Sequence, residues 1–141
     1  MSEPYKQITV QTLVHAPLET VWRYWTEPQH IQAWNSASPD WHTPHATNDL
    51  RVGGTFLSRM EAKDKSAGFD FNGTYTEVIP HSSIAYTIEG GRPVQISFEP
   101  LADGVQVTER FALEDENSEE LQRAGWQAIL DHFKQYVESH S

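Results

Sequence analysis

The sequence contains no cysteine, which excludes a disulfide framework, a thiol nucleophile and a thiolate metal site. It also lacks any apolar run approaching the roughly 20 residues that span a bilayer. Its first ten residues, MSEPYKQITV, have neither the basic region nor the apolar region of a secretory signal. We therefore expect a cytoplasmic protein in a reducing compartment, without membrane insertion.

Basic residues are scarce. Ten Lys and Arg stand against twenty Asp and Glu, which gives a formal net charge of -10 at pH 7. A charge of this sign repels phosphate backbones and anionic membrane surfaces. The composition therefore argues against nucleic acid as a partner.

The chain nevertheless contains enough apolar side chain to fold. Hydrophobic residues make up 38% of the 141 residues and aromatic residues 11%, whereas disordered segments are poor in aromatic residues. A chain of this length lies in the usual size range of one domain with one core. We expect a single domain over residues 1–141.

Period-two alternation of apolar and polar residues predicts most of the strands. The segment 7–15 alternates in this way, as half-buried strands do. Four later segments share the pattern: 69–79, 84–89, 93–100 and 105–113. Asp103-Gly104 predicts a hairpin turn before the last of them. The segment 50–62 predicts two strands that meet at Gly53-Gly54, beside a local ion pair of Asp49 and Arg51. This glycine pair permits a bend, a bulge or a tight turn, and we expect a bend within the sheet.

Helical spacing appears at both ends of the chain. Residues 16–25 predict a short helix, and residues 26–29 resemble a capping box that opens a second one toward Trp34. The segment from Asn117 to about Ser139 predicts a long helix, in which Asn117 and Glu120 cap the start. Its apolar stripe is Trp126, Ile129, Leu130, Phe133 and Val137.

The order of these elements predicts the fold class. One strand precedes two short helices, about six further strands follow, and the chain closes with the long helix. The stripe of that helix is the largest apolar surface available to cover the sheet. We predict an α+β helix-grip fold, in which a curved antiparallel sheet of six to seven strands wraps around the long C-terminal helix.

Four segments in order resemble the SRPBCC (START-like, helix-grip) superfamily: APLETVWRYWTEPQHIQAW, DLRVGGTF, FNGTYTEV and GWQAILDHFKQYVE. Within that superfamily they look like the small bacterial homologues of the activator of the heat-shock-protein-90 ATPase. The resemblance covers nearly the whole chain. It implies a cavity between the long helix and the concave sheet, where relatives bind lipids, sterols, polyketides or other apolar molecules. It transfers no reaction.

The stretch 33–54 has no steady hydrophobic period, and we expect an irregular loop there. Trp34 and Trp41 are expected at the rim or lid of the cavity, or alternatively at one end of the core. His42 and His45 have a spacing seen in zinc sites, but a proline lies between them and no second pair of Cys or His stands nearby. We predict a solvated loop and no metal site.

Glu109 is the sharpest polar signal in the sequence. It shares an otherwise apolar strand row with Val107 and Phe111. Burial of an unpaired carboxylate is costly, so Glu109 should be paired, protonated with a raised pKa, or directed at a ligand. Under the pairing alternative, its partner is Arg59 or Arg110 at an edge.

Tyr75 and Tyr86 also lie on apolar rows, and their hydroxyls are candidates to anchor the polar end of a ligand. A satisfied core tyrosine is the commoner case. The candidate cavity residues are Trp34, Trp41, Phe56, Phe71, Tyr75, Tyr86, Phe98, Glu109, Trp126 and Ile129.

These observations leave three classes of function open. The first is a binding module for a small, mostly apolar ligand, without a cofactor. The second is an enzyme of the cyclase or hydratase type that uses a cavity carboxylate and a tyrosine. Neither GxSxG nor HExxH occurs, which argues against hydrolase chemistry. No catalytic residue is assigned, because the sequence does not show whether two carboxylates such as Glu77 and Glu109 come within hydrogen-bond reach. The third is a protein-interaction module, with a chaperone among its possible partners. A monomer and a homodimer both fit.

Overall fold

The computed structural model describes residues 6–88, 91–114 and 117–140. Its elements are β1 (Gln7–Val14), α1 (Leu18–Thr26), α2 (Pro28–Trp34), β2 (Trp41–Asn48), β3 (Thr55–Ala62), β4 (Gly68–Ile79), β5 (Ser83–Ile88), β6 (Arg92–Leu101), β7 (Gly104–Ala112) and α3 (Glu119–His140). No helix within the described ranges is long and apolar enough to cross a membrane.

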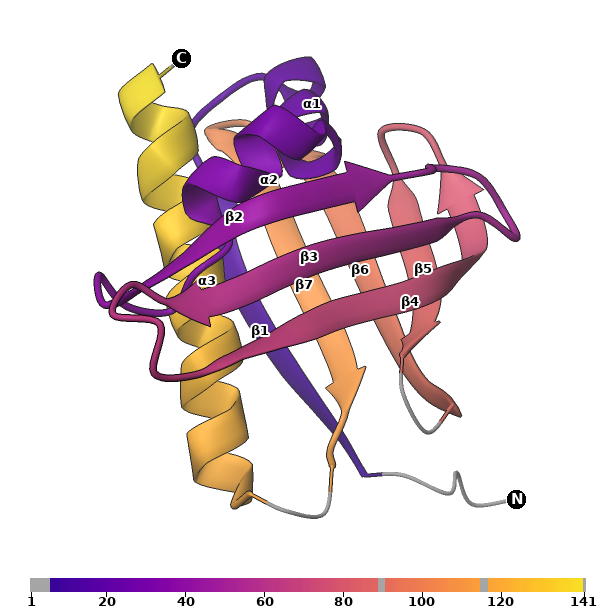
Figure 1. The fold of residues 1–141 in the computed structure, drawn as a ribbon. Helices are drawn as coiled ribbons and strands as arrows, with labels where there is room; N and C mark the ends of the chain where they lie inside the picture. Colours follow the sequence, from indigo (N-terminus) through magenta and orange to yellow (C-terminus); the bar gives the residue numbers. More distant parts are fainter. Residues whose placement is uncertain (1–5, 89–90, 115–116, 141) are drawn as a thin grey trace.

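The seven strands form one sheet in the order β1-β7-β6-β5-β4-β3-β2, and all neighbouring strands are antiparallel. The sheet is strongly curled: β2, β3 and β4 run across the view in Figure 1, while β1, β7 and β6 run steeply behind them. α3 packs along β1. The predicted α+β helix-grip fold is confirmed.

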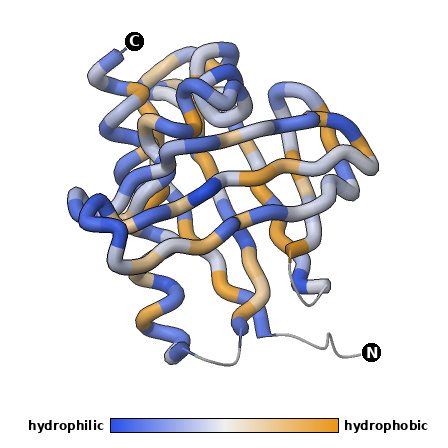
Figure 2. The backbone as a smooth tube through the Cα atoms, viewed as in Figure 1, coloured by the Kyte–Doolittle hydropathy of each residue, from blue (hydrophilic) through white to orange (hydrophobic). Residues whose placement is uncertain are grey.

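Alternation along the strands decides which side chains fill the core. On β7, Val105, Val107 and Phe111 are fully buried, and on β6 Phe98 pairs with Val107 and Val94 with Phe111 in the sheet's inner layer. Figure 2 shows hydrophobic and hydrophilic residues alternating along the backbone of the sheet. The period-two signal therefore identified the inner face of these strands correctly.

α3 buries one apolar stripe, as its spacing predicts. Leu130, Phe133 and Val137 are fully buried. The predicted cap is wrong: Ser118, rather than Asn117, accepts a hydrogen bond from the backbone N–H of Leu121 at 3.1 Å. Serine and asparagine are both good capping residues. α3 begins at Glu119, so Ser118 is the residue placed to cap the N–H of the third helical residue, Leu121.

The predicted capping box between α1 and α2 is also wrong. Glu27 stands at the start of α2, and no side chain caps it. Thr26 ends α1 instead, where its hydroxyl donates to the carbonyl of Trp22 at 2.9 Å. A threonine at a helix end can satisfy a backbone group of the turn before it, and this competes with capping of the next helix.

The expected irregular loop over residues 33–54 contains a strand, so this prediction is wrong over Trp41–Asn48. β2 is the edge of the sheet, and its pairing with β3 shifts register between His42 and His45. Pro44 lies within that shift and is exposed. An edge strand tolerates a proline and a bulge, because one side of its backbone needs no strand partner.

The two strands predicted over residues 50–62 are one strand, β3, preceded by a turn. Gly53 has a φ of 84°, and a Cβ on Gly54 would lie 2.2 Å from the carbonyl oxygen of Asp49. The glycines therefore make the turn rather than a bend inside a sheet. The predicted pair of Asp49 and Arg51 is confirmed, with 2.9 Å between Nε and Oδ2.

Candidate functional site

A cavity of about 320 Å³ lies between the inner face of the sheet and the helices, and we call it the inner cavity. All three helices and strands β2 to β7 contribute to its wall. The lining residues are Trp25, Ile31, Trp34, Asn35, Thr47, Phe56, Ser58, Met60, Phe69, Phe71, Tyr75, Ile84, Tyr86, Ile88, Arg92, Glu109, Glu114, Asn117, Gln122, Trp126 and Ile129.

Glu109 is the buried acid of this wall. Its place in the alternation of β7 turns it inward between Val107 and Phe111, and only 5% of it is exposed. Within the described part of the chain, no hydrogen bond or ion pair joins its carboxyl to another residue. Burial without a compensating charge raises the pKa of Glu109 to about 8.

The predicted pairing of Glu109 with an arginine is wrong. Arg59 on β3 donates to Glu61 at 2.9 Å and to Asp70 at 3.3 Å. Arg110 directly follows Glu109 on β7, so its side chain points to the opposite, exposed face. Neither guanidinium reaches the cavity wall, and Glu109 meets the remaining two alternatives: a raised pKa and a direction toward the cavity.

Tyr75 and Tyr86 face the same cavity from paired positions on β4 and β5. The Tyr75 hydroxyl donates a hydrogen bond to Oδ1 of Asn48, so it has a protein partner. Burial raises the pKa of both tyrosines, and for Tyr86 the nearby carboxyl of Glu109 raises it further. Tyr86 and Glu109 are thus two polar groups on the same largely apolar wall.

Aromatic rings make up much of the remaining wall. Phe56 meets Tyr86 edge-on, with 4.7 Å between ring centroids. Phe71 lies 6.4 Å from Tyr86 and 6.0 Å from Trp126, in edge-on contacts with both. Trp126 in turn stacks on Phe111. These rings, with Tyr86 among them, form a continuous aromatic cluster on the wall that also contains Glu109.

The structure brings eight of the ten predicted cavity residues to this wall and leaves two outside it. Phe98 is buried in the core, where its ring lies 5.4 Å from that of Trp22. Trp41 borders a separate groove of about 630 Å³ beside α3, and its ring lies 6.0 Å from that of Phe69.

Sequence reasoning missed several wall residues. Ser58 and Met60 share the inward row of β3 with Phe56, and both are buried. The period-two signal was available there, in the second of the two strands predicted over residues 50–62, but these two side chains were not singled out on it. Arg92 and Gln122 border the wall at positions that no local pattern distinguishes.

The histidine pair of β2 does not form a metal centre in the described residues. His42 lies 4.0 Å from Glu61 on the neighbouring strand, between Nε2 and Oε1. No group of three or more His, Cys, Asp or Glu in the part of the chain that the structure covers is arranged to hold a metal ion.

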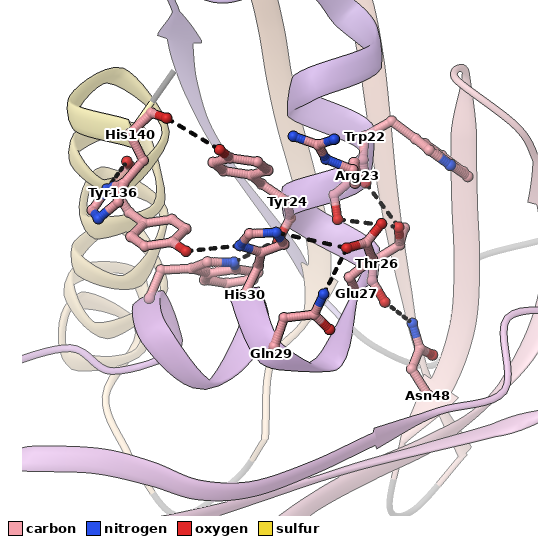
Figure 3. Close-up of polar contacts among 11 residues, drawn as sticks. Trp22, Arg23, Tyr24, Thr26, Glu27, Gln29, His30, Asn48, Tyr136 and His140 are labelled. Carbon is pink, nitrogen blue, oxygen red and sulfur yellow. Dashed lines mark hydrogen bonds and ion pairs between the residues drawn. The ribbon is translucent and has the colours of Figure 1, made fainter.

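A second polar cluster lies outside the cavity, where α1 and α2 meet α3 (Figure 3). His30 stacks on Tyr24, with ring centroids 4.1 Å apart, and its Nδ1 lies 2.7 Å from the Tyr136 hydroxyl. Its Nε2 lies 3.6 Å from Oε1 of Glu27, and the Tyr24 hydroxyl donates to the carbonyl of His140 at 3.2 Å. This cluster attaches the two short helices to the end of α3.

Comparison with known proteins agrees with this architecture. Residues 15–138 match the family model described as "Activator of Hsp90 ATPase homolog 1-like protein". The AHSA1-like protein of Aeromonas hydrophila is 42% identical over 95% of this chain and 93% of its own, with a TM-score of 0.90. Chr148 of Cytophaga hutchinsonii is 50% identical over 94% of this chain and 92% of its own, with a TM-score of 0.82.

More distant structures share the fold alone. NE0264 of Nitrosomonas europaea is 19% identical over 96% of both chains, with a TM-score of 0.82. Among proteins of curated function, none matches the chain. The family match spans most of the sequence, and the helix-grip fold with its inner cavity is that of a family of ligand-binding domains. The chain therefore belongs to the activator of Hsp90 ATPase homologue 1-like family.

Proposed function

We propose that this protein binds a small, mostly apolar molecule in the inner cavity. The observation that carries the proposal is an apolar, largely aromatic wall interrupted by a buried carboxyl and a few other polar groups. Ligand sites in proteins combine these two features, because apolar walls supply affinity and a few polar groups fix orientation. Lipid-, sterol- and polyketide-like molecules are the ligand types we propose to test first.

The size of the cavity limits the ligand. Small-molecule pockets span roughly 300 to 1,000 Å³, and about 320 Å³ lies at the lower end of that range. We propose that Glu109 and Tyr86 meet the polar end of the ligand, while Phe56, Phe71 and Trp126 contact its apolar body.

Native mass spectrometry of the protein mixed with a cell extract tests this function. We expect a stoichiometric apolar passenger, released and identified on denaturation. Ile129→Trp places a large ring on the cavity side of α3 and should remove the passenger. Ala124→Trp makes the same addition at an exposed position of that helix and should leave it bound. If the protein stays empty across several extracts, or if both variants behave alike, the cavity is not the binding site.

An enzyme is the second candidate function, and the presence of the buried acid Glu109 and the hydroxyl of Tyr86 on one cavity wall favours it. Burial raises the pKa of Glu109 to about 8, so this acid can donate or accept a proton near neutral pH. Glu109→Gln would then abolish turnover of a bound molecule while the molecule still binds. Recovery of an unchanged passenger after prolonged incubation with the wild-type protein would argue for binding alone.

A further inference from the structure

Among the residues that the structure describes, none donates a hydrogen bond to the carboxyl of Glu109, which faces the inner cavity. It is 5% exposed and borders the inner cavity, and no cation among the described residues pairs with it. Buried carboxyls ordinarily have a hydrogen-bond donor or a positive charge beside them, because an isolated one is costly to bury. The missing partner is therefore a candidate contribution of the ligand.

The aromatic cluster beside Glu109 favours a positive partner. Phe56, Phe71, Tyr86 and Trp126 line the cavity, and their rings contact one another in a chain. Aromatic faces attract cations through the negative side of the ring, and this attraction strengthens where water is excluded. A carboxylate that accepts hydrogen bonds, together with several aromatic rings, is the combination of groups that recognises an organic ammonium.

The charges of the cavity wall and of the whole chain also favour a cationic ligand. Glu114 is a second acid at the wall, whereas Arg92, the one basic residue there among the described residues, already donates to the carbonyl of Ala112 at 3.5 Å. The chain as a whole carries a formal charge of -10. Its field concentrates cations at the surface and repels anionic ligands such as fatty acids.

We infer that the inner cavity selects an organic ammonium: a small molecule with an apolar body and one protonated amine, which pairs with the carboxylate of Glu109. This inference rests on the proposed function and narrows its ligand class. The apolar body occupies the aromatic part of the cavity, and the nitrogen lies between Glu109 and Tyr86.

The pH dependence of binding has a sign that distinguishes this ligand from a neutral one. Because the pKa of Glu109 in the empty cavity is about 8, an arriving ammonium must displace the carboxyl proton at neutral pH. Aliphatic amines resemble lysine, with a pKa of about 10.4, and stay charged. Affinity for the amine therefore rises with pH up to about 8, whereas a ligand that accepts the Glu109 proton in a hydrogen bond would lose affinity.

The other ionisable groups of the wall do not reverse this dependence. Burial raises the pKa of Tyr75 and Tyr86 further above neutral, and the Arg92 guanidinium stays charged. Glu114 is the remaining acid, and Glu114→Gln tests whether it carries any of the effect.

Calorimetric titration with decylamine, decanol and decanoate tests the inference, because the three probes share one chain and differ in the head group. We expect decylamine to bind more tightly than decanol, and decanoate to bind most weakly. The affinity for decylamine should rise by up to about tenfold per pH unit between pH 6 and 8. Glu114→Gln should retain this rise.

Two variants distinguish direct pairing of the amine with Glu109 from attraction by the net negative charge of the protein. Glu109→Gln should weaken decylamine by about 30-fold or more, because one partner of a buried pair is lost, and should leave decanol within about twofold. Glu99→Gln removes the same charge from an exposed position of β6 and should leave all three affinities nearly unchanged. If Glu109→Gln does not fold, the inference is tested by the wild-type protein alone, through the pH dependence of its decylamine affinity and the order in which it binds the three probes.

Two results overturn the inference, and they differ in what they leave standing. Equal binding of decanol and decylamine, or decylamine affinity that is flat or falls with pH, rejects the ammonium ligand but keeps a cavity that binds apolar molecules. Failure of all three probes to bind rejects the ammonium ligand and counts against the proposed function as well.

Discussion

Trp126 of α3 lies flat on Phe111 of β7: the two ring planes differ by 6°, and the ring centroids are 4.2 Å apart. Phe111 is fully buried, whereas Trp126 also borders the inner cavity. The stack therefore joins the long helix to the sheet at the point where the core ends and the cavity begins.

Phe111→Ala should destabilise the protein by about 3–5 kcal/mol, because it removes a fully buried ring from the core. Urea unfolding measures the change. A double-mutant cycle with Trp126→Ala should give a coupling of about 0.5–1.5 kcal/mol for the stack. Leu121→Ala on the exposed face of α3 should change stability by less than about 0.5 kcal/mol. Additive effects of the two core substitutions would contradict a direct contribution of the stack.

The stability of the fold should fall as pH rises, because of Glu109. Its pKa is about 8 in the folded chain and has an ordinary value of 4.5, so between these values the folded chain binds more protons than the unfolded one. The free energy of unfolding then decreases with pH across this window and is constant above it.

Glu109→Gln should remove this dependence. Relative to wild type, the variant should gain about 3 kcal/mol in unfolding free energy between pH 5 and pH 8. Urea titrations at several pH values measure the difference. Parallel pH profiles of the two proteins would show that Glu109 ionises in the folded state as easily as in the unfolded one.

Tyr136→Phe should destabilise the protein by about 0.5–1.5 kcal/mol, since it removes the hydroxyl that bonds to Nδ1 of His30. Thermal unfolding is a suitable measurement. In a His30→Ala background the same substitution should cost almost nothing, because the partner is already gone. An equal cost in both backgrounds would mean that Tyr136 acts through its ring alone.

Two glycines should respond to alanine in opposite ways. A Cβ on Gly104 would lie 2.2 Å from the carbonyl oxygen of Val14, whereas a Cβ on Gly125 would meet nothing within 4 Å. Gly104→Ala should therefore destabilise the β6–β7 turn by more than about 1 kcal/mol. Gly125→Ala, inside α3, should stabilise by roughly 0.5–1 kcal/mol. Equal effects at both positions would exclude the close approach as the cause.

The sequence predicted the elements that bury one regular face. In β6 and β7 this face follows the period of two residues, and in α3 it follows the helical period, so the hydrophobic pattern was enough to locate them. β2 was missed because an edge strand with a bulge and Pro44 has no regular buried face. The turn at Gly53-Gly54 was placed inside a sheet because a glycine pair looks the same in a turn and in a bend.

The candidate site was predictable only in part, because curvature decides which rows face each other. Glu109 was correctly singled out on its row, but its pairing depended on strands distant in the sheet, and Arg59 is held by acids of its own neighbourhood. Phe98 and Trp126 read alike as apolar positions. Trp22 and Trp25 of α1 cover Phe98, which lies in the core, whereas Trp126 borders the cavity.

The pairing of β1 with β7 also constrains how the protein is made. Partners such as Gln7 and Ala112, or Val14 and Val105, are about a hundred residues apart along the chain. During synthesis, β1 can find its native partners only after β7 and α3 have been made. A nascent chain that ends before β7 therefore has no native partner for β1, and we expect cooperative folding to follow release from the ribosome rather than to proceed stepwise from the N-terminus.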